Sequence, residues 1–88
     1  MSLPDPVATI QKNRRETVRV SLSEFKGTDL VDLRVFAPKP GGVEGEVVPT
    51  PKGLALSIAK LPELRAALAL AQAEAERRGL LPVNGSAA

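Results

Sequence analysis

The sequence has 88 residues, 43% of them hydrophobic and 2% aromatic, which fits one small globular domain with an aliphatic core. It contains no cysteine and no histidine, which excludes disulfide frameworks, Cys/His zinc sites, thiol nucleophiles and histidine-based catalysis. The formal charge of +2 balances 12 basic against 10 acidic residues, so a site for a polyanion must come from local clustering of cations.

The two ends of the chain lack the pattern of a regular element. Residues 1–6 carry prolines at Pro4 and Pro6, and residues 82–88 are mostly small and polar. We expect a flexible N-terminal arm over 1–6 and a flexible C-terminal tail over 82–88. The domain then occupies residues 7–81.

Three strands are predicted in the first half of the chain. The segment Val7–Lys12 is rich in β-branched residues, and residues 13–16 form the polar turn that follows it. Apolar and polar residues alternate strictly in Thr17–Phe25, and they do so again in Asp29–Phe36. Because a short loop containing Gly27 joins these two runs, we expect them to form a hairpin.

A long surface loop is predicted over residues 37–52. This segment contains four prolines and three glycines, so we expect no regular ladder to run through it. Loops of this length in a compact domain are usually functional or disordered. The alternation returns in Gly53–Ile58, which predicts a fourth strand.

The last predicted element is a helix over Leu61–Arg78, built almost entirely of strong helix formers. Pro62 near its start and Gly79 just past its end agree with the usual polarity of helix termini. Its alanines extend the apolar surface beyond one stripe of leucines, which predicts a second helix from another subunit. The expected fold class is α+β: a curved, four-stranded antiparallel sheet followed by one C-terminal helix, in a homodimer.

The two phenylalanines are the only aromatic residues of the chain. Alternation places Phe25 on the same strand face as Arg19, and Phe36 on the same face as Arg34, so both rings are expected on the polar side of the sheet. Exposed rings among cations suit single-stranded nucleic acid, because rings stack on bases and cations meet phosphates. The alternative is that the rings cover an edge of the core and the charges form an ordinary solvated surface.

Other kinds of site are not indicated. The sequence has no glycine-rich phosphate motif that leads into a helix, and its serines have no histidine base. We therefore predict no enzymatic activity, no cofactor and no metal site. No apolar run is long enough for a membrane span, and we expect a cytoplasmic protein, associated with the nucleoid if its source is bacterial.

Three motifs carry a resemblance to a known family. RVSLSEFKG at 19–27, LVDLR at 30–34 and PKGL at 51–54, followed by a leucine-rich helix, resemble the C-terminal domain of positive cofactor four. This is a transcriptional-coactivator family of single-stranded DNA-binding proteins with bacterial and phage members. The resemblance covers roughly residues 10–78 and implies a β-β-β-β-α protomer, a homodimer formed partly through the helices, and sheet surfaces that hold single strands or melted duplex.

The resemblance also implies roles for individual residues. Phe25 would stack on a base, while Lys26, Arg34 and Lys52 would contact phosphate or base. A tryptophan of the eukaryotic form is an alanine here, and Phe36, one residue earlier, is a possible substitute for it. The predicted nucleic-acid-binding residues are Lys12, Arg15, Arg19, Phe25, Lys26, Arg34, Phe36 and Lys52.

The predicted function is non-catalytic binding of single-stranded DNA, largely independent of sequence, in transcription regulation or DNA maintenance. Two alternatives stay open. One is a protein-interaction module, a helix-mediated dimer that recruits the transcription machinery. The other is an RNA-binding protein, because stacking and phosphate pairing do not distinguish ribose from deoxyribose.

Overall fold

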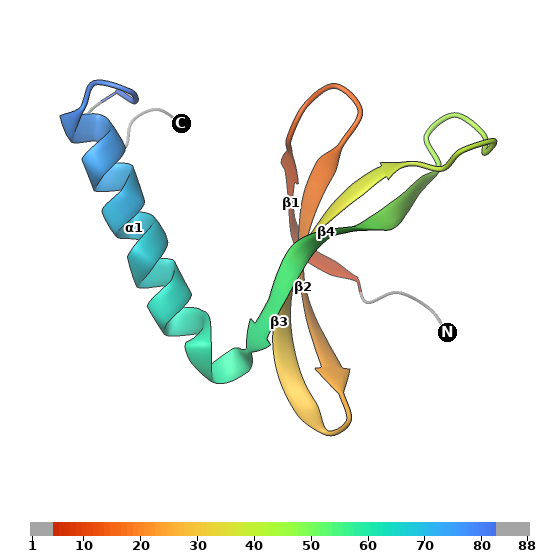
Figure 1. Ribbon diagram of the computed structural model, residues 1–88, viewed down its shortest axis with the longest axis horizontal. Helices are drawn as coiled ribbons and strands as arrows, with labels where there is room; N and C mark the ends of the chain where they lie inside the picture. Colours follow the sequence, from red (N-terminus) through yellow and green to blue (C-terminus); the bar gives the residue numbers. More distant parts are fainter. Residues whose placement is uncertain (1–4, 83–88) are drawn as a thin grey trace. The chain divides into compact units, whose positions relative to one another are not determined.

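The computed structural model describes residues 5–82, so most of the predicted arm and tail lies outside the described residues. The chain divides after Ile58 into two compact units, a sheet and a helical segment (Figure 1). Each unit is built from contiguous sequence.

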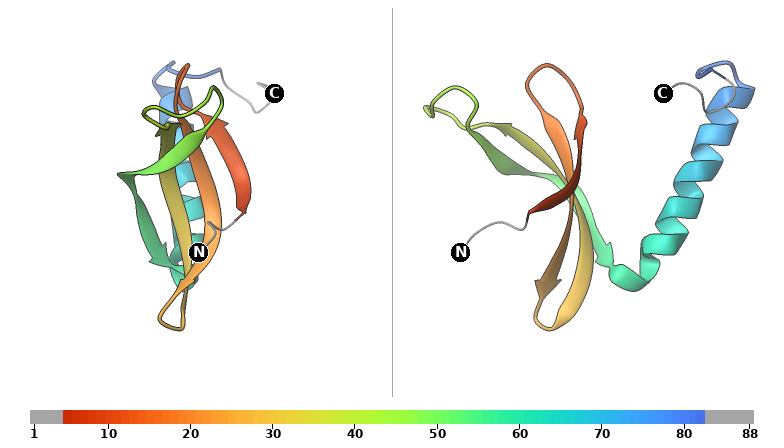
Figure 2. Two further views of the ribbon diagram at one scale, coloured as in Figure 1. Left: turned by 90° about the vertical axis from the view of Figure 1, so that its right-hand side faces the viewer. Right: turned by 180° about the vertical axis from the view of Figure 1, so that it is seen from behind.

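The sheet unit contains four antiparallel strands in the order β1-β2-β3-β4. The strands are β1 (Pro6–Gln11), β2 (Thr17–Phe25), β3 (Thr28–Pro38) and β4 (Val47–Ser57). The sheet is strongly twisted, and the β1–β2 and β3–β4 loops lie at the opposite end from the β2–β3 turn (Figures 1 and 2). The predicted four-stranded antiparallel sheet is confirmed.

The β2–β3 hairpin has an unbroken register from Thr17 opposite Phe36 to Phe25 opposite Thr28. Lys26 and Gly27, which connect the strands, have φ values of 52° and 81°. Positive φ at both central residues is the geometry of a type I′ turn, whose twist matches that of the strands. Glycine adopts this conformation freely, whereas a lysine does so at a cost.

The prediction of a loop over 37–52 is wrong, because β3 and β4 both extend into it and leave only residues 39–46 between them. Pro49 and Pro51 lie inside β4. This strand is at the edge of the sheet, where a missing backbone N–H breaks no ladder on the open side. Proline content therefore excluded a central strand here but not an edge strand.

Buried side chains come from both sides of the sheet. Val31 and Val35 are buried on one face, and Ser21 and Phe36 are buried on the other. A strong twist lets neighbouring strands cover side chains on either side. Alternation therefore does not separate this sheet into a fully buried face and a fully exposed one.

A short 3-10 turn, Ile58–Lys60, spans the boundary after Ile58, and the helical unit continues as α1, Leu61–Arg77. Its end is a Schellman motif: Gly79 has φ 76°, and the backbone N–H of Leu80 donates to the carbonyl of Ala75 at 2.8 Å. The predicted helix over Leu61–Arg78 is thus confirmed to within one residue.

Candidate nucleic-acid interface

One face of the sheet carries four of the eight predicted site residues. Arg19 on β2 lies directly opposite Arg34 on β3, so both side chains leave the sheet on the same side. Phe25 shares this side with Arg19 on β2, and Phe36 shares it with Arg34 on β3. We refer to this side, defined by these four residues, as the arginine face.

Phe25 lies at the tip of the β2–β3 hairpin, where its side chain is 62% exposed. Pairing between β1 and β2 ends at Ser21, so β1 does not flank this tip. The Nζ atom of Lys26 lies 5.3 Å from the centroid of the Phe25 ring. The structure thus presents an accessible ring beside a cation, as alternation predicts for Phe25.

The prediction that Phe36 is exposed is wrong, because its side chain is only 6% exposed. The ring lies on the predicted face, but Cζ of Arg19 lies over it, 4.3 Å from its centroid. Thr17 on β2 and Pro49 on β4 are its partners on the two neighbouring strands. A ring inside a central strand is covered by its neighbours, so Phe36 does not offer an open surface to a base.

Arg34 is held by groups of the protein itself. Its Nη2 donates to Oδ2 of Asp32 at 3.2 Å, and its Nη1 donates to the carbonyl oxygens of Thr50 at 3.4 Å and Pro51 at 3.2 Å. These contacts tie the guanidinium to the irregular part of β4. Much of its donor capacity is therefore already used.

Gly53, opposite Arg34, makes this arrangement possible. A Cβ atom there would lie 2.3 Å from the carbonyl oxygen of Leu33 and 3.2 Å from Cζ of Arg34. Its φ of 152° is also one that other residues rarely adopt. The glycine of the Lys-Gly pair in the sequence motif is thus required because a larger residue would clash with Leu33 and Arg34.

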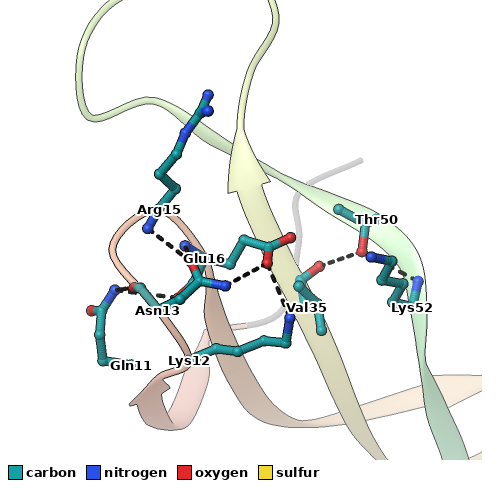
Figure 3. A network of polar contacts seen from close by, with 8 residues as sticks. All are labelled: Gln11, Lys12, Asn13, Arg15, Glu16, Val35, Thr50 and Lys52. Carbon is teal, nitrogen blue, oxygen red and sulfur yellow. Dashed lines mark hydrogen bonds and ion pairs between the residues drawn. The ribbon is translucent and has the colours of Figure 1, made fainter.

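Lys52 is placed by an irregularity of β4. The register between β3 and β4 shifts between Arg34 and Phe36. The Oγ1 of Thr50 donates to the carbonyl of Val35 at 2.8 Å and accepts the backbone N–H of Lys52 at 3.2 Å (Figure 3). This local network fixes the backbone of Lys52 and leaves the residue exposed.

The β1–β2 turn is organised by Asn13 and Glu16. Oδ1 of Asn13 accepts the backbone N–H groups of Arg15 and Glu16, both at 2.9 Å. The Glu16 carboxylate accepts Nδ2 of Asn13 at 2.8 Å and Nζ of Lys12 at 3.0 Å. These two hydrogen bonds, that of Asn13 first, lower the pKa of Glu16 below its usual value.

The two predicted site residues of this turn, Lys12 and Arg15, therefore differ in whether a carboxylate pairs with them. Lys12 is paired with Glu16, whereas the Arg15 side chain points away from the network (Figure 3). An open hollow of about 580 Å³ adjoins this turn, and both arginines of the turn line it; its lining residues are Asn13, Arg14, Arg15, Glu16, Ala37 and Pro38.

Comparison with known proteins identifies the family. The model of the family described as Transcriptional Coactivator p15 (PC4) matches residues 12–67, which hold the whole arginine face. The chain belongs to the PC4 family. The resemblance drawn from the sequence is confirmed: the matching family is one of transcriptional coactivators.

The fold agrees with that of a bacterial PC4 protein. BPSL1147, a PC4 homolog from Burkholderia pseudomallei K96243, matches in its orthorhombic crystal form with a TM-score of 0.70 and 25% identity, over 82% of this chain and 93% of BPSL1147. Its tetragonal form matches with a TM-score of 0.70 and 26% identity, over 80% and 98% of the two chains. A search of curated proteins found no match.

Within residues 5–82, no group of three or more acidic residues is arranged to hold a metal ion. None of the helices in this part of the chain has the length and apolar character that a membrane crossing requires.

Sequence reasoning missed several residues that shape the candidate interface. Asn13 and Glu16 hold the β1–β2 turn, and Thr50 holds the irregular part of β4. An asparagine followed three residues later by a glutamate at a predicted turn is a usable signal for the first pair. Thr50 had no such signal, because its partner is fifteen residues away in the sequence.

Proposed function

We propose that this PC4-family protein binds single-stranded DNA without catalysis and largely without sequence preference, in transcription regulation or DNA maintenance. The observation that carries the proposal is Phe25, exposed beside Lys26 on the arginine face. Every base has a π-face on which such a ring can stack, and the nearby cation can meet a phosphate. Duplex DNA hides its base faces within the stack, which favours single strands.

The backbone of Lys26 supports this assignment. A non-glycine residue with φ near 52° costs about 1–2 kcal/mol relative to an ordinary conformation. Asparagine and aspartate tolerate it better and are usual in type I′ turns. Residues held in costly conformations cluster at functional sites. A lysine in this place is therefore consistent with selection for its charge.

The other cations fall into two groups, those that a neighbouring carboxylate pairs with and those that have no such partner among the described residues. We assign phosphate contacts to Lys52 and Arg15, which are exposed, together with Lys26. Arg34 pairs with Asp32, and Lys12 pairs with Glu16. These two paired cations contribute less to the attraction of a polyanion, because a neighbouring carboxylate already offsets their charge.

The first test is the Phe25→Ala variant. Loss of one base-stacking ring should weaken the binding of a labelled single-stranded oligonucleotide by about 1–3 kcal/mol, measured by fluorescence anisotropy. The melting temperature should hardly change, because the ring is exposed. Wild-type affinity in this variant would contradict the stacking role of Phe25.

A second test concerns electrostatics. In Lys52→Ala, the dependence of log affinity on log salt should become shallower by about 0.7, the value for one lost single-strand phosphate contact. Lys60→Ala serves as a control outside the sheet, because Lys60 is an exposed lysine that pairs with Glu63 in the helical unit. An unchanged slope in Lys52→Ala would remove Lys52 from the interface.

The strand type is decided by competition. We expect single-stranded DNA to displace a labelled strand better than duplex of the same sequence. A matched RNA strand that competes better than DNA would favour the RNA-binding alternative.

We also propose that the protein is a homodimer through α1. Leu68 and Leu70 are 57% and 73% exposed, and at 100° per residue they lie on different sides of the helix. Apolar surface of this extent is typical of a helix that meets a partner. The mass in solution, measured by sedimentation equilibrium, should be twice that of the chain, and Leu68→Glu should reduce it.

A further inference from the structure

The environment of Arg19 differs from that of the arginine opposite it. Arg34 donates to a carboxylate and to two backbone carbonyls. Within residues 5–82, Arg19 has neither an ion pair nor a side-chain hydrogen bond, and its one specific contact is the ring of Phe36, 4.3 Å from Cζ. The aromatic ring, and not an acceptor, therefore positions this guanidinium.

The polar atoms around this ring are left unsatisfied. Nε of Arg19 and Oγ1 of Thr17 are both buried without a hydrogen-bond partner among the described residues. Thr17 is the β2 partner of Phe36, so both atoms belong to the same cluster. Buried polar groups are nearly always paired, and exceptions require an explanation. The position of Arg19 over the ring therefore leaves a buried donor without a hydrogen bond, which is unfavourable for stability.

Arg19 as a whole is half-buried, and of its three guanidinium nitrogens only Nε is fully buried without a partner. The two terminal nitrogens therefore keep some surface and have no hydrogen bond to the described residues. Phe36 covers one side of the group, so a base would have to approach from the other side. A guanidinium is planar and weakly hydrated, and bases stack on it as they stack on aromatic rings.

We propose that Arg19 is a second base-stacking residue and that buried Phe36 is its positioning residue. This rests on the proposed function and deepens it. Phe25 and Arg19 share the arginine face of β2 and lie six residues apart, which corresponds to about 20 Å along a strand. The protein would then hold one base on the open ring at the hairpin tip and another on the guanidinium.

The test uses Arg19→Lys, which keeps the charge and removes the plane. Its affinity is measured for a single-stranded oligonucleotide and for an abasic strand of the same length. We expect binding to the normal strand to weaken about tenfold, and binding to the abasic strand to change by about twofold or less. The salt dependence should stay the same, because the charge is conserved.

Phe36→Leu tests the positioning role, since leucine fills much of the space but provides no ring. It should weaken binding to the normal strand, and adding it to Arg19→Lys should cause little further loss, because Phe36 acts through Arg19. Additive losses would contradict this role. Thermal unfolding of each variant serves as the control that tests whether the fold is retained.

Three results would overturn the proposal or its premise. Wild-type affinity of Arg19→Lys for both strands would show that Arg19 does not stack. Equal losses on both strands would show that its guanidinium contacts the backbone instead. If the unaltered protein binds neither strand, the proposed function itself fails, and this outcome is distinct from the other two.

Discussion

The two ends of the β2–β3 hairpin use the same sheet face in different ways. Phe25 and Phe36 both lie on the arginine face, but their side chains are 62% and 6% exposed. The Phe25 end is a hairpin tip that β1 does not reach. At the other end, Phe36 lies between Thr17 and Pro49 on neighbouring strands and beneath Arg19.

The difference teaches that alternation determines the face of a side chain and not its burial. Burial depends on how many strands flank the position and on which long side chains lie across it. In this sheet, the two-stranded tip leaves a ring exposed that a ligand can contact, whereas the ring at the flanked end is buried and contributes to stability. The first two of the following predictions compare these two ends, and the third concerns the hairpin tip alone.

The largest difference should appear in stability. Phe36→Ala should lower the free energy of unfolding by about 3 kcal/mol, because it removes a buried ring and leaves a cavity. Phe25→Ala should change it by no more than about 0.5 kcal/mol, the usual range for an exposed site. Urea denaturation of both variants measures this. Similar losses would mean that the two ends are equally packed.

A smaller difference is expected between two glycines. Gly53→Ala should cost about 2 kcal/mol or more, because its Cβ would overlap the carbonyl oxygen of Leu33. Gly27→Ala should cost about 1 kcal/mol, the price of a left-handed backbone alone, since nothing lies within 4 Å of its Cβ. Thermal unfolding compares them. A larger loss for Gly27 would show that the hairpin tip is the more constrained end.

The third prediction concerns Lys26→Asn, whose expected effect on stability is no larger than that of Gly27→Ala. Asparagine tolerates the positive φ, so the free energy of unfolding should rise by up to about 1 kcal/mol while the affinity for single-stranded DNA falls. Lys26→Arg is the control, because it keeps the charge and should retain most of the binding. If Lys26→Asn binds like the unaltered protein, the lysine has no part in recognition.

The sequence by itself determined the elements with strong local signals. The bounds of β2 follow from strict alternation, and those of α1 follow from its helix formers and the terminal Gly79. The type of side chain on the arginine face and the family also follow from local patterns and motifs. These features depend on residues close together in the chain. The spacing of apolar residues, every two in a strand or every 3.6 in a helix, therefore predicts them directly.

Only the tertiary structure decided which members of the candidate site are accessible. The burial of Phe36 depends on Arg19 from another strand, and the path of β4 through Pro49 depends on its place at the sheet edge. The pairing of Arg34 likewise depends on carbonyl groups more than fifteen residues away. Such contacts join segments that are distant in the sequence, so the local spacing of apolar residues cannot predict them.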